Sequence, residues 1–164
     1  MSNIIVVIIF ILLILFLQIG IMPHIAISGA YPNLILISIL CLSIIRDWKK
    51  VLPWTILGGL FLDFYSLLNI LGISVIALLV VSYLVYFLSQ NVFKKTTFFS
   101  LTSIFLVTLF IYNLLFVVVF KISDSGFNFS VSGFFIGIIY NFIFALPIFY
   151  LLKKYDAKFT KIQD

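Results

Sequence analysis

The chain has 164 residues, of which 65% are hydrophobic and 9% are charged, and its mean hydropathy is +1.35. Soluble domains carry roughly a quarter charged residues, so this composition argues against a soluble enzyme or binding domain and indicates a bilayer protein. The net charge of +5 does not point to nucleic acid, because the basic residues flank apolar segments instead of forming one basic surface.

Six apolar segments are predicted to cross the membrane, for which a helix needs about twenty residues. In chain order they are Ile4–Met22, Pro32–Ile45, Val51–Tyr65, Gly72–Gln90, Phe98–Lys121 and Val131–Leu152. No Lys or Arg precedes the first segment, so we interpret it as a retained helix and not as a cleaved signal peptide. The predicted fold class is all-α, a polytopic transmembrane bundle of six helices, forming one integral membrane domain over residues 1–164.

The second and third segments are short, and a chain with four or five spans remains open if they form a re-entrant pair. The distribution of positive charge favours six. Nine of the ten basic residues lie in three polar breaks, listed as Arg46, Lys49 and Lys50, then Lys94 and Lys95, then Lys153, Lys154, Lys158 and Lys161. Cytoplasmic loops collect Lys and Arg, and six spans place all three breaks and both termini on that side. Residues 153–164 are then a basic cytoplasmic tail.

Asp63 is the first candidate for a functional role. Counted from Val51, it lies roughly 18 Å along its helix at about 1.5 Å per residue, where an ionisable group must face protein or water. It can bind a substrate or relay a proton, or it can close the end of its helix by accepting backbone N–H bonds from the Ser66–Leu71 turn. We favour the structural role, because no Lys or Arg lies within the interior of the spans to pair with it.

Glycine and asparagine residues are candidates for helix packing. Small residues let membrane helices approach closely, which favours contacts at Gly58, Gly59, Gly133 and Gly137. Asn113 and Asn141 lie near the middle of the last two helices, where each amide seeks a hydrogen bond from another helix and where they can bond to one another.

The inventory of catalytic residues is thin. One His and one Cys cannot build a metal site, and no phosphate-binding loop is present, so we predict no cofactor, no metal and no enzymatic activity. The coherent alternative is an intramembrane aspartic protease that uses Asp63 and Asp124 as a dyad. Neither residue lies in the Asn-, Arg- and Ala-containing signatures of lipoprotein signal peptidases.

Residues 31–86 resemble the MreD family, the small membrane subunit of the bacterial rod-shape (elongation) complex. The resemblance begins with Tyr31-Pro32-Asn33-Leu34, continues through Gly58-Gly59-Leu60-Phe61-Leu62-Asp63 and includes Leu71-Gly72. Phe64–Ile70 lack the glycine and proline that the family often has there, so the turn after Asp63 is expected to differ.

This resemblance implies a non-catalytic scaffold in the bacterial inner membrane. Its expected partner is an MreC-like single-span protein, which links it indirectly to an MreB-like filament and to the RodA and penicillin-binding protein synthase, with lipid around it and no nucleic acid. The expected structural or partner residues are Pro32, Asn33, Gly58, Gly59, Asp63, Gly72, Asn113, Gly133, Gly137 and Asn141.

The family fold resembles the S-components of energy-coupling-factor vitamin transporters, so a small-molecule-binding transport subunit is the main alternative. S-components commonly dock their energising partner through small residues on the first helix. Ile4–Leu17 contains no Gly or Ala, and such a bulky helix cannot offer that close approach. This difference favours the scaffold.

Overall fold

The computed structural model describes residues 13–65, 72–93, 97–122 and 130–160. The α-helices are residues 13–20, α2 (Leu34–Ile45), α3 (Trp48–Tyr65), α4 (Ile73–Phe87), α5 (Phe98–Ile122) and α6 (Val131–Thr160). A 3₁₀ turn, η1 (Met22–Ile25), follows the first helix, and a π-helical turn, η2 (Leu88–Val92), follows α4. The only β-type pairing in the described part of the chain is the isolated bridge between Ile27 and Ala30. The predicted all-α fold class is confirmed.

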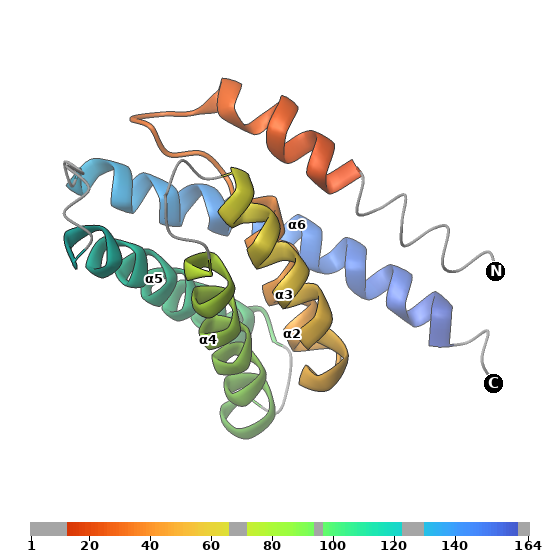
Figure 1. Ribbon diagram of the computed structural model, residues 1–164. Coiled ribbons are helices and arrows are strands. Elements are labelled where there is room, and N and C mark those ends of the chain that lie inside the picture. The colour runs from red at the N-terminus through yellow and green to blue at the C-terminus, as the bar shows by residue number, and fades with distance from the viewer. Residues whose placement is uncertain (1–12, 66–71, 94–96, 123–129, 161–164) are drawn as a thin grey trace.

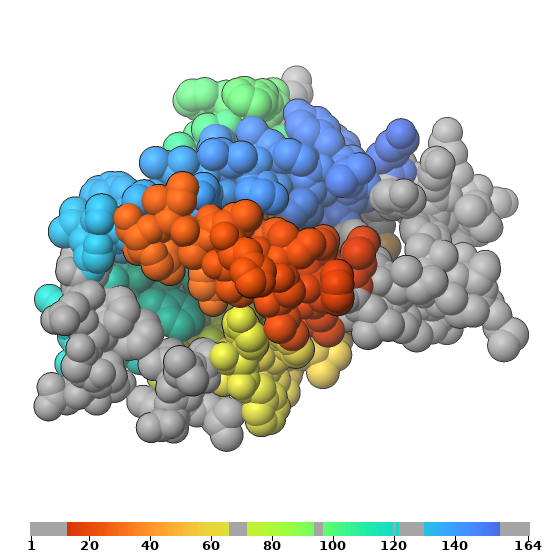
Figure 2. Space-filling view, turned by 90° about the horizontal axis from the view of Figure 1, so that it is seen from above, coloured from red at the N-terminus to blue at the C-terminus, as the bar shows by residue number. Residues whose placement is uncertain are grey.

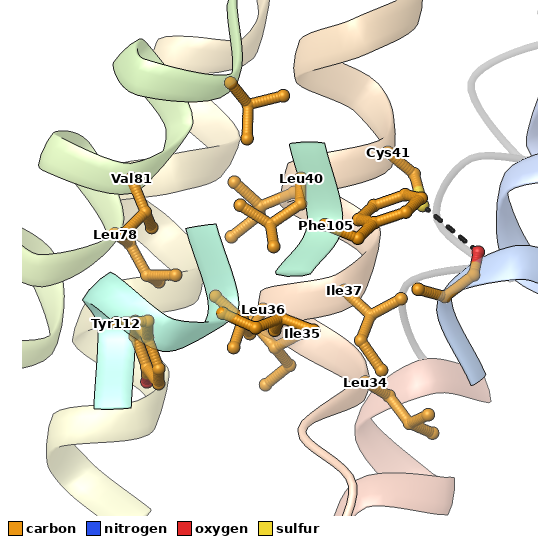
Figure 3. Packing of buried hydrophobic residues seen from close by; sticks show 14 of the residues in the cluster. Leu34, Ile35, Leu36, Ile37, Leu40, Cys41, Leu78, Val81, Phe105 and Tyr112 are labelled. Carbon is orange, nitrogen blue, oxygen red and sulfur yellow. Dashed lines mark hydrogen bonds between the residues drawn. The ribbon is translucent and has the colours of Figure 1, made fainter. Parts of the chain in front are cut away.

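Helix α2 forms the centre of the bundle. Apart from Ser38 and Ser43 its residues are apolar, and a helix that is hydrophobic all round is a buried helix. All of its residues except Leu42 and Ile45 are buried, and it packs against α3, α4 and α6. In the view of Figure 3, Leu40 of α2 lies between Val81 of α4 and Phe105 of α5, and all three belong to the buried core.

The other helices surround α2. From α3 to α6, each helix packs against the next one in the chain (Figure 1). The segment that begins at residue 13 lies on the surface between α6 and α3 (red to orange in Figure 2). Its residues Ile14, Leu15 and Leu17 pack against the core.

Two adjacent glycines let α3 approach both of its neighbours. A Cβ atom at Gly58 would lie 2.8 Å from Ile39 Cδ1 and 2.9 Å from Ile35 Cγ2, both in α2. A Cβ atom at Gly59 would lie 2.5 Å from Val75 Cα and 2.8 Å from Val75 N, in the first turn of α4. The predicted close-packing contacts at these two positions are therefore formed inside the bundle.

Three helical segments of the described chain are long and apolar enough to cross a membrane, namely Ile73–Val92, Phe98–Val119 and Val131–Lys154. Helix α2 is apolar but has only 12 residues. Helix α3 has 18 residues but includes Lys49, Lys50 and Asp63. Residues 4–12 of the first predicted span lie outside the described residues, so six spans remains a prediction.

Several predicted helix boundaries shift. Helix α3 begins at Trp48, three residues before the predicted start at Val51, and Lys49 and Lys50 therefore belong to its first turn and not to a loop. Helix α4 ends at Phe87, and the chain continues through η2 to Val92. Helix α6 continues to Thr160, so much of the predicted tail is helical. Lysines near a helix C-terminus interact favourably with the helix dipole, which is consistent with this extension.

Candidate functional site

The first part of the candidate site is the start of α4, which the carboxyl group of Asp63 closes. Asp63 lies in the last turn of α3 and is only 2% exposed. Its Oδ2 accepts a 2.8 Å hydrogen bond from the backbone N–H of Gly72, and its Oδ1 accepts a 2.8 Å bond from that of Ser74. The first N–H groups of a helix have no partner within the helix, so this carboxyl group supplies two of the missing acceptors.

Gly72 allows the backbone to adopt the turn that leads into α4. It is the N-cap residue of α4, its φ is +100°, and it contributes no side-chain cap. The left-handed backbone conformation is readily adopted by glycine and is costly for most other residues. The turn thereby brings the N–H groups of residues 72 and 74 to the same carboxyl group. The sequence predicts that Asp63 accepts N–H bonds from the Ser66–Leu71 turn and closes its own helix; Ser66–Leu71 lie outside the described residues, and the donors described are Gly72 and Ser74 at the start of α4.

The second part of the site is the start of α2, where buried side chains from three other parts of the fold meet. We call Gln18, Asn33, Tyr112 and Asn141 the α2 amide cluster. Asn33 is the N-cap residue, and its Oδ1 accepts a 3.0 Å bond from Leu36 N. The backbone N–H of Asn33 itself donates to Asn141 Oδ1 of α6 at 2.7 Å. Asn33 Nδ2 lies 3.4 Å from the Tyr112 hydroxyl of α5.

Gln18 completes this arrangement from the helix of residues 13–20. Its Oε1 accepts a 2.7 Å bond from Leu34 N, and its Nε2 donates to Pro32 O at 3.4 Å. Gln18 is 1% exposed. The N-cap residue and the first and third positions of α2 thus each have a side-chain acceptor for their N–H group.

The burial of its first turn explains why α2 needs these acceptors. The first N–H groups of a helix have no partner within the helix. Leu34, Ile35 and Leu36 are buried in the protein, away from water that could satisfy these groups. Side-chain amides therefore replace water at this end of α2.

The two predicted asparagines behave differently. Asn141 bonds to another segment, as expected, and its Nδ2 also donates to Gly137 O at 2.7 Å. Asn113 instead donates to Leu109 O of its own helix at 2.8 Å. The two amides are not bonded to one another, because each has its partner elsewhere.

The glycine step of α6 packs inside the protein. A Cβ atom at Gly133 would lie 3.3 Å from Ser28 O, in the connection between the first helix and α2. A Cβ atom at Gly137 would lie 3.6 Å from Asn113 Oδ1 and 3.9 Å from Ala30 Cβ. This face of α6 therefore accommodates the connection and α5.

Sequence reasoning missed Gln18 and Tyr112. Gln18 is the only residue with a polar side chain in the predicted span Ile4–Met22, and that isolation was the available signal. Tyr112 gave no such signal, because tyrosine is common throughout this chain. Tyr31, in the connection before α2, is partly buried, and this burial raises its pKa, with the nearby Tyr65 raising it further.

The described part of the chain shows no arrangement of side chains for a metal site or for the aspartic protease dyad. No group of three His, Cys, Asp or Glu residues is placed there to hold a metal ion. Asp63 already accepts two backbone bonds. Asp124, its partner in the protease alternative, lies outside the described residues.

Comparison with known proteins identifies the family. The sequence model of the rod shape-determining protein MreD matches residues 1–155. The chain belongs to the MreD family. No curated protein and no solved structure matches it. The resemblance predicted from residues 31–86 is confirmed, and the match includes both capped helix starts and reaches residue 155 of α6.

Membership in the MreD family gives the general role of the protein. MreD proteins are rod shape-determining proteins, so the chain is a membrane protein of the cell-shape system. The long apolar helices α4, α5 and α6 agree with this class.

Proposed function

We propose that this MreD-family protein is a non-catalytic membrane scaffold of the peptidoglycan elongation machinery, which docks an MreC-like single-span protein through its apolar helix faces. The observation that carries the proposal is that the polar side chains of the candidate site bond to the protein's own backbone. Asp63, Gln18, Asn33 and Asn141 bond to backbone groups at helix ends. Such bonds stabilise a fixed shape, and a fixed shape is what a scaffold requires.

The proposed topology has six spans in the bacterial inner membrane with both termini in the cytoplasm. Lys49 and Lys50 at the start of α3 are exposed, as are Lys153 and Lys154 toward the end of α6. These positions suit a cytoplasmic interface, where positive charge accumulates. Single cysteines at Lys49, Lys153 and Ser28, in a Cys41→Ala background, test it. A membrane-impermeant maleimide applied to intact cells should label only the cysteine at Ser28.

The docking proposal rests on apolar ridges that face outward. Exposed apolar residues recur every three or four positions on α3 and on α4. They are Leu57, Leu60 and Phe64 on α3, and Ile76, Val80, Tyr83 and Phe87 on α4. This spacing makes continuous ridges of the kind that pack into the grooves of another helix. Helices α5 and α6 carry further exposed apolar residues, among them Phe110 and Tyr150.

Photocrosslinking in cells tests which ridge meets a partner. p-Azidophenylalanine replaces one aromatic residue at a time, namely Phe64, Tyr83, Phe110 or Tyr150, which are exposed residues of α3, α4, α5 and α6. Phe105 is the matched control, because it is an aromatic residue that is fully buried. We expect an adduct with a single-span protein at one or two of the exposed positions and none at Phe105.

The identity of the adduct decides between the candidate functions. Recovery of an MreC-like protein, followed by an MreB-like filament or a RodA and penicillin-binding protein synthase in milder purification, supports the scaffold. Recovery of a paired ATPase module instead would establish an S-component-like transport subunit. Processing of a lipoprotein precursor that is lost on substitution of Asp63 would establish a protease.

A further inference from the structure

The helix of residues 13–20 has two faces of the same chemistry. Its inward residues Ile14, Leu15 and Leu17 pack against the core, whereas Leu13, Phe16 and Ile19 are exposed. In a bilayer, lipid tails are as apolar as these side chains, so hydrophobicity gives little preference for one face over the other. Something else must select the face that packs against the core.

Gln18 is the residue that distinguishes the faces. It is the only polar side chain in this helix, it is buried, and both ends of its amide bond to the backbone at the start of α2. A shift of the helix by one residue along its axis would rotate it by about 100° and move it by about 1.5 Å. Either displacement would break both bonds, leave Leu34 N without its acceptor and place the Gln18 amide in lipid.

We propose that Gln18 is a positioning residue that sets the rotation and depth of the N-terminal helix on the bundle. One buried polar side chain fixes register in this way in coiled coils, where apolar packing alone permits several registers. In this protein the amide specifies one position of the N-terminal helix, because both of its bonds are made to residues at the start of α2. The inference is independent of the proposed function, since it concerns how the chain orders its own first helix.

Distance measurement between spin labels tests the proposal in the full-length protein in lipid nanodiscs. The native thiol is removed by Cys41→Ala, and labels are attached at Phe16→Cys and Leu106→Cys, both exposed positions, the second on α5. A second labelled pair, Leu57→Cys and Leu106→Cys, reports on α3 against α5 and does not involve the N-terminal helix.

Three variants of the key position are compared with the parent. Gln18→Leu removes the amide and keeps the size. The double change Gln18→Ile with Ile19→Gln keeps the composition and moves the amide to the exposed face. Gln18→Glu keeps an acceptor for Leu34 N and loses the donor to Pro32 O.

We expect one narrow distance for the first pair in the parent and in Gln18→Glu. In Gln18→Leu and in the exchanged variant, the ratio of correctly placed to displaced helices should fall about threefold or more, as for loss of one average interhelical hydrogen bond. The second pair should stay unchanged in every variant. An unchanged first pair in Gln18→Leu would overturn the proposal in favour of apolar packing. Broadening of both pairs together would overturn it as well, because Gln18 would then support the whole bundle and not the placement of one helix.

Discussion

The two buried helix starts of this protein are closed in contrasting ways. The start of α4 is closed by one carboxyl group, Asp63, which precedes its two donors by 9 and 11 residues in the sequence. The start of α2 is closed by Gln18, Asn33 and Asn141, and the last of these is 108 residues away from its donor. One cap is local and depends on a single side chain, and the other joins distant segments.

This contrast indicates where the fold is sensitive to substitution. At α4 the loss of one side chain removes two acceptors at once. At α2 the acceptors are divided among three side chains, so each substitution removes one acceptor and leaves the others. The difference can be measured by unfolding the purified protein with SDS in mixed micelles.

The largest effect is expected for Asp63→Leu. It leaves the buried N–H group of Ser74 and the half-buried N–H group of Gly72 without their acceptor, at up to about 1–3 kcal/mol each, so the free energy of unfolding should fall by about 2–4 kcal/mol. Asp63→Asn keeps one acceptor oxygen and should lose about half as much. Asp47→Asn is the control, because its side chain is 72% exposed and lies 4.0 Å from Lys50 in a surface ion pair. Equal stability of Asp63→Leu and the parent would contradict the role of Asp63 as the cap of α4.

The next effect is expected for Gly59→Ala, which acts on the same helix start. The added methyl group meets backbone atoms of Val75, and main chain cannot move aside without displacing α4. Overpacking of this kind costs about 1–3 kcal/mol, and we expect a value at the upper end. Gly58→Ala is the matched control, because its methyl group meets side-chain atoms, Ile39 Cδ1 and Ile35 Cγ2, and no main-chain atom. A larger loss for Gly58→Ala than for Gly59→Ala would show that the α2 contact limits the fold.

The local cap was within reach of sequence analysis, and the distributed one was not. The depth of Asp63 in an apolar helix marks it in the sequence and predicts backbone N–H donors from Ser66–Leu71, whereas the donors that the structure describes are Gly72 and Ser74. Its donors lie within 11 residues of it, so a turn after α3 was sufficient to bring them near. Helix positions followed from the length of the apolar runs, which is why Phe98–Lys121 agrees with α5 to within one residue.

The α2 amide cluster depends on how distant helices pack. Asn141 was predicted to bond to another helix, but its actual partner, the backbone of Asn33, is a group that every residue carries and that no motif marks. Gln18 lies alone in an apolar span, and nothing in the sequence indicates that its partners are the backbone groups of Pro32 and Leu34. The length of an apolar run does not show where a helix ends when the helix continues into polar residues. Helix α6 does so, since it continues through Lys153 and Lys154 to Thr160.

A smaller effect is expected for Asn141→Leu. It removes the acceptor of Asn33 N and leaves the other side-chain bonds of the α2 start in place. Interhelical hydrogen bonds in membrane proteins contribute about 0.6 kcal/mol on average and up to about 1.7 kcal/mol, and the loss should fall in that range. Combining it with Gln18→Leu should cost more than the sum of the two, because the remaining acceptors then no longer hold α2 in register. Strict additivity would indicate that the bonds act independently.

The smallest effect is expected for Asn113→Leu, which makes the same chemical change in the neighbouring helix. Asn113 donates to Leu109 O, a carbonyl that lies one turn earlier in its own helix, so its removal leaves no buried backbone N–H without an acceptor. Leucine also has the better helix propensity by a few tenths of a kcal/mol, at most about 0.5. The free energy of unfolding should therefore change by less than about 0.5 kcal/mol, measured in the same SDS titration. If Asn113→Leu were as costly as Asn141→Leu, the contact of its side chain with the Gly137 face of α6 would be the reason. The cost of losing an amide in this bundle would then depend on helix contact, and not on whether a backbone donor is left without an acceptor.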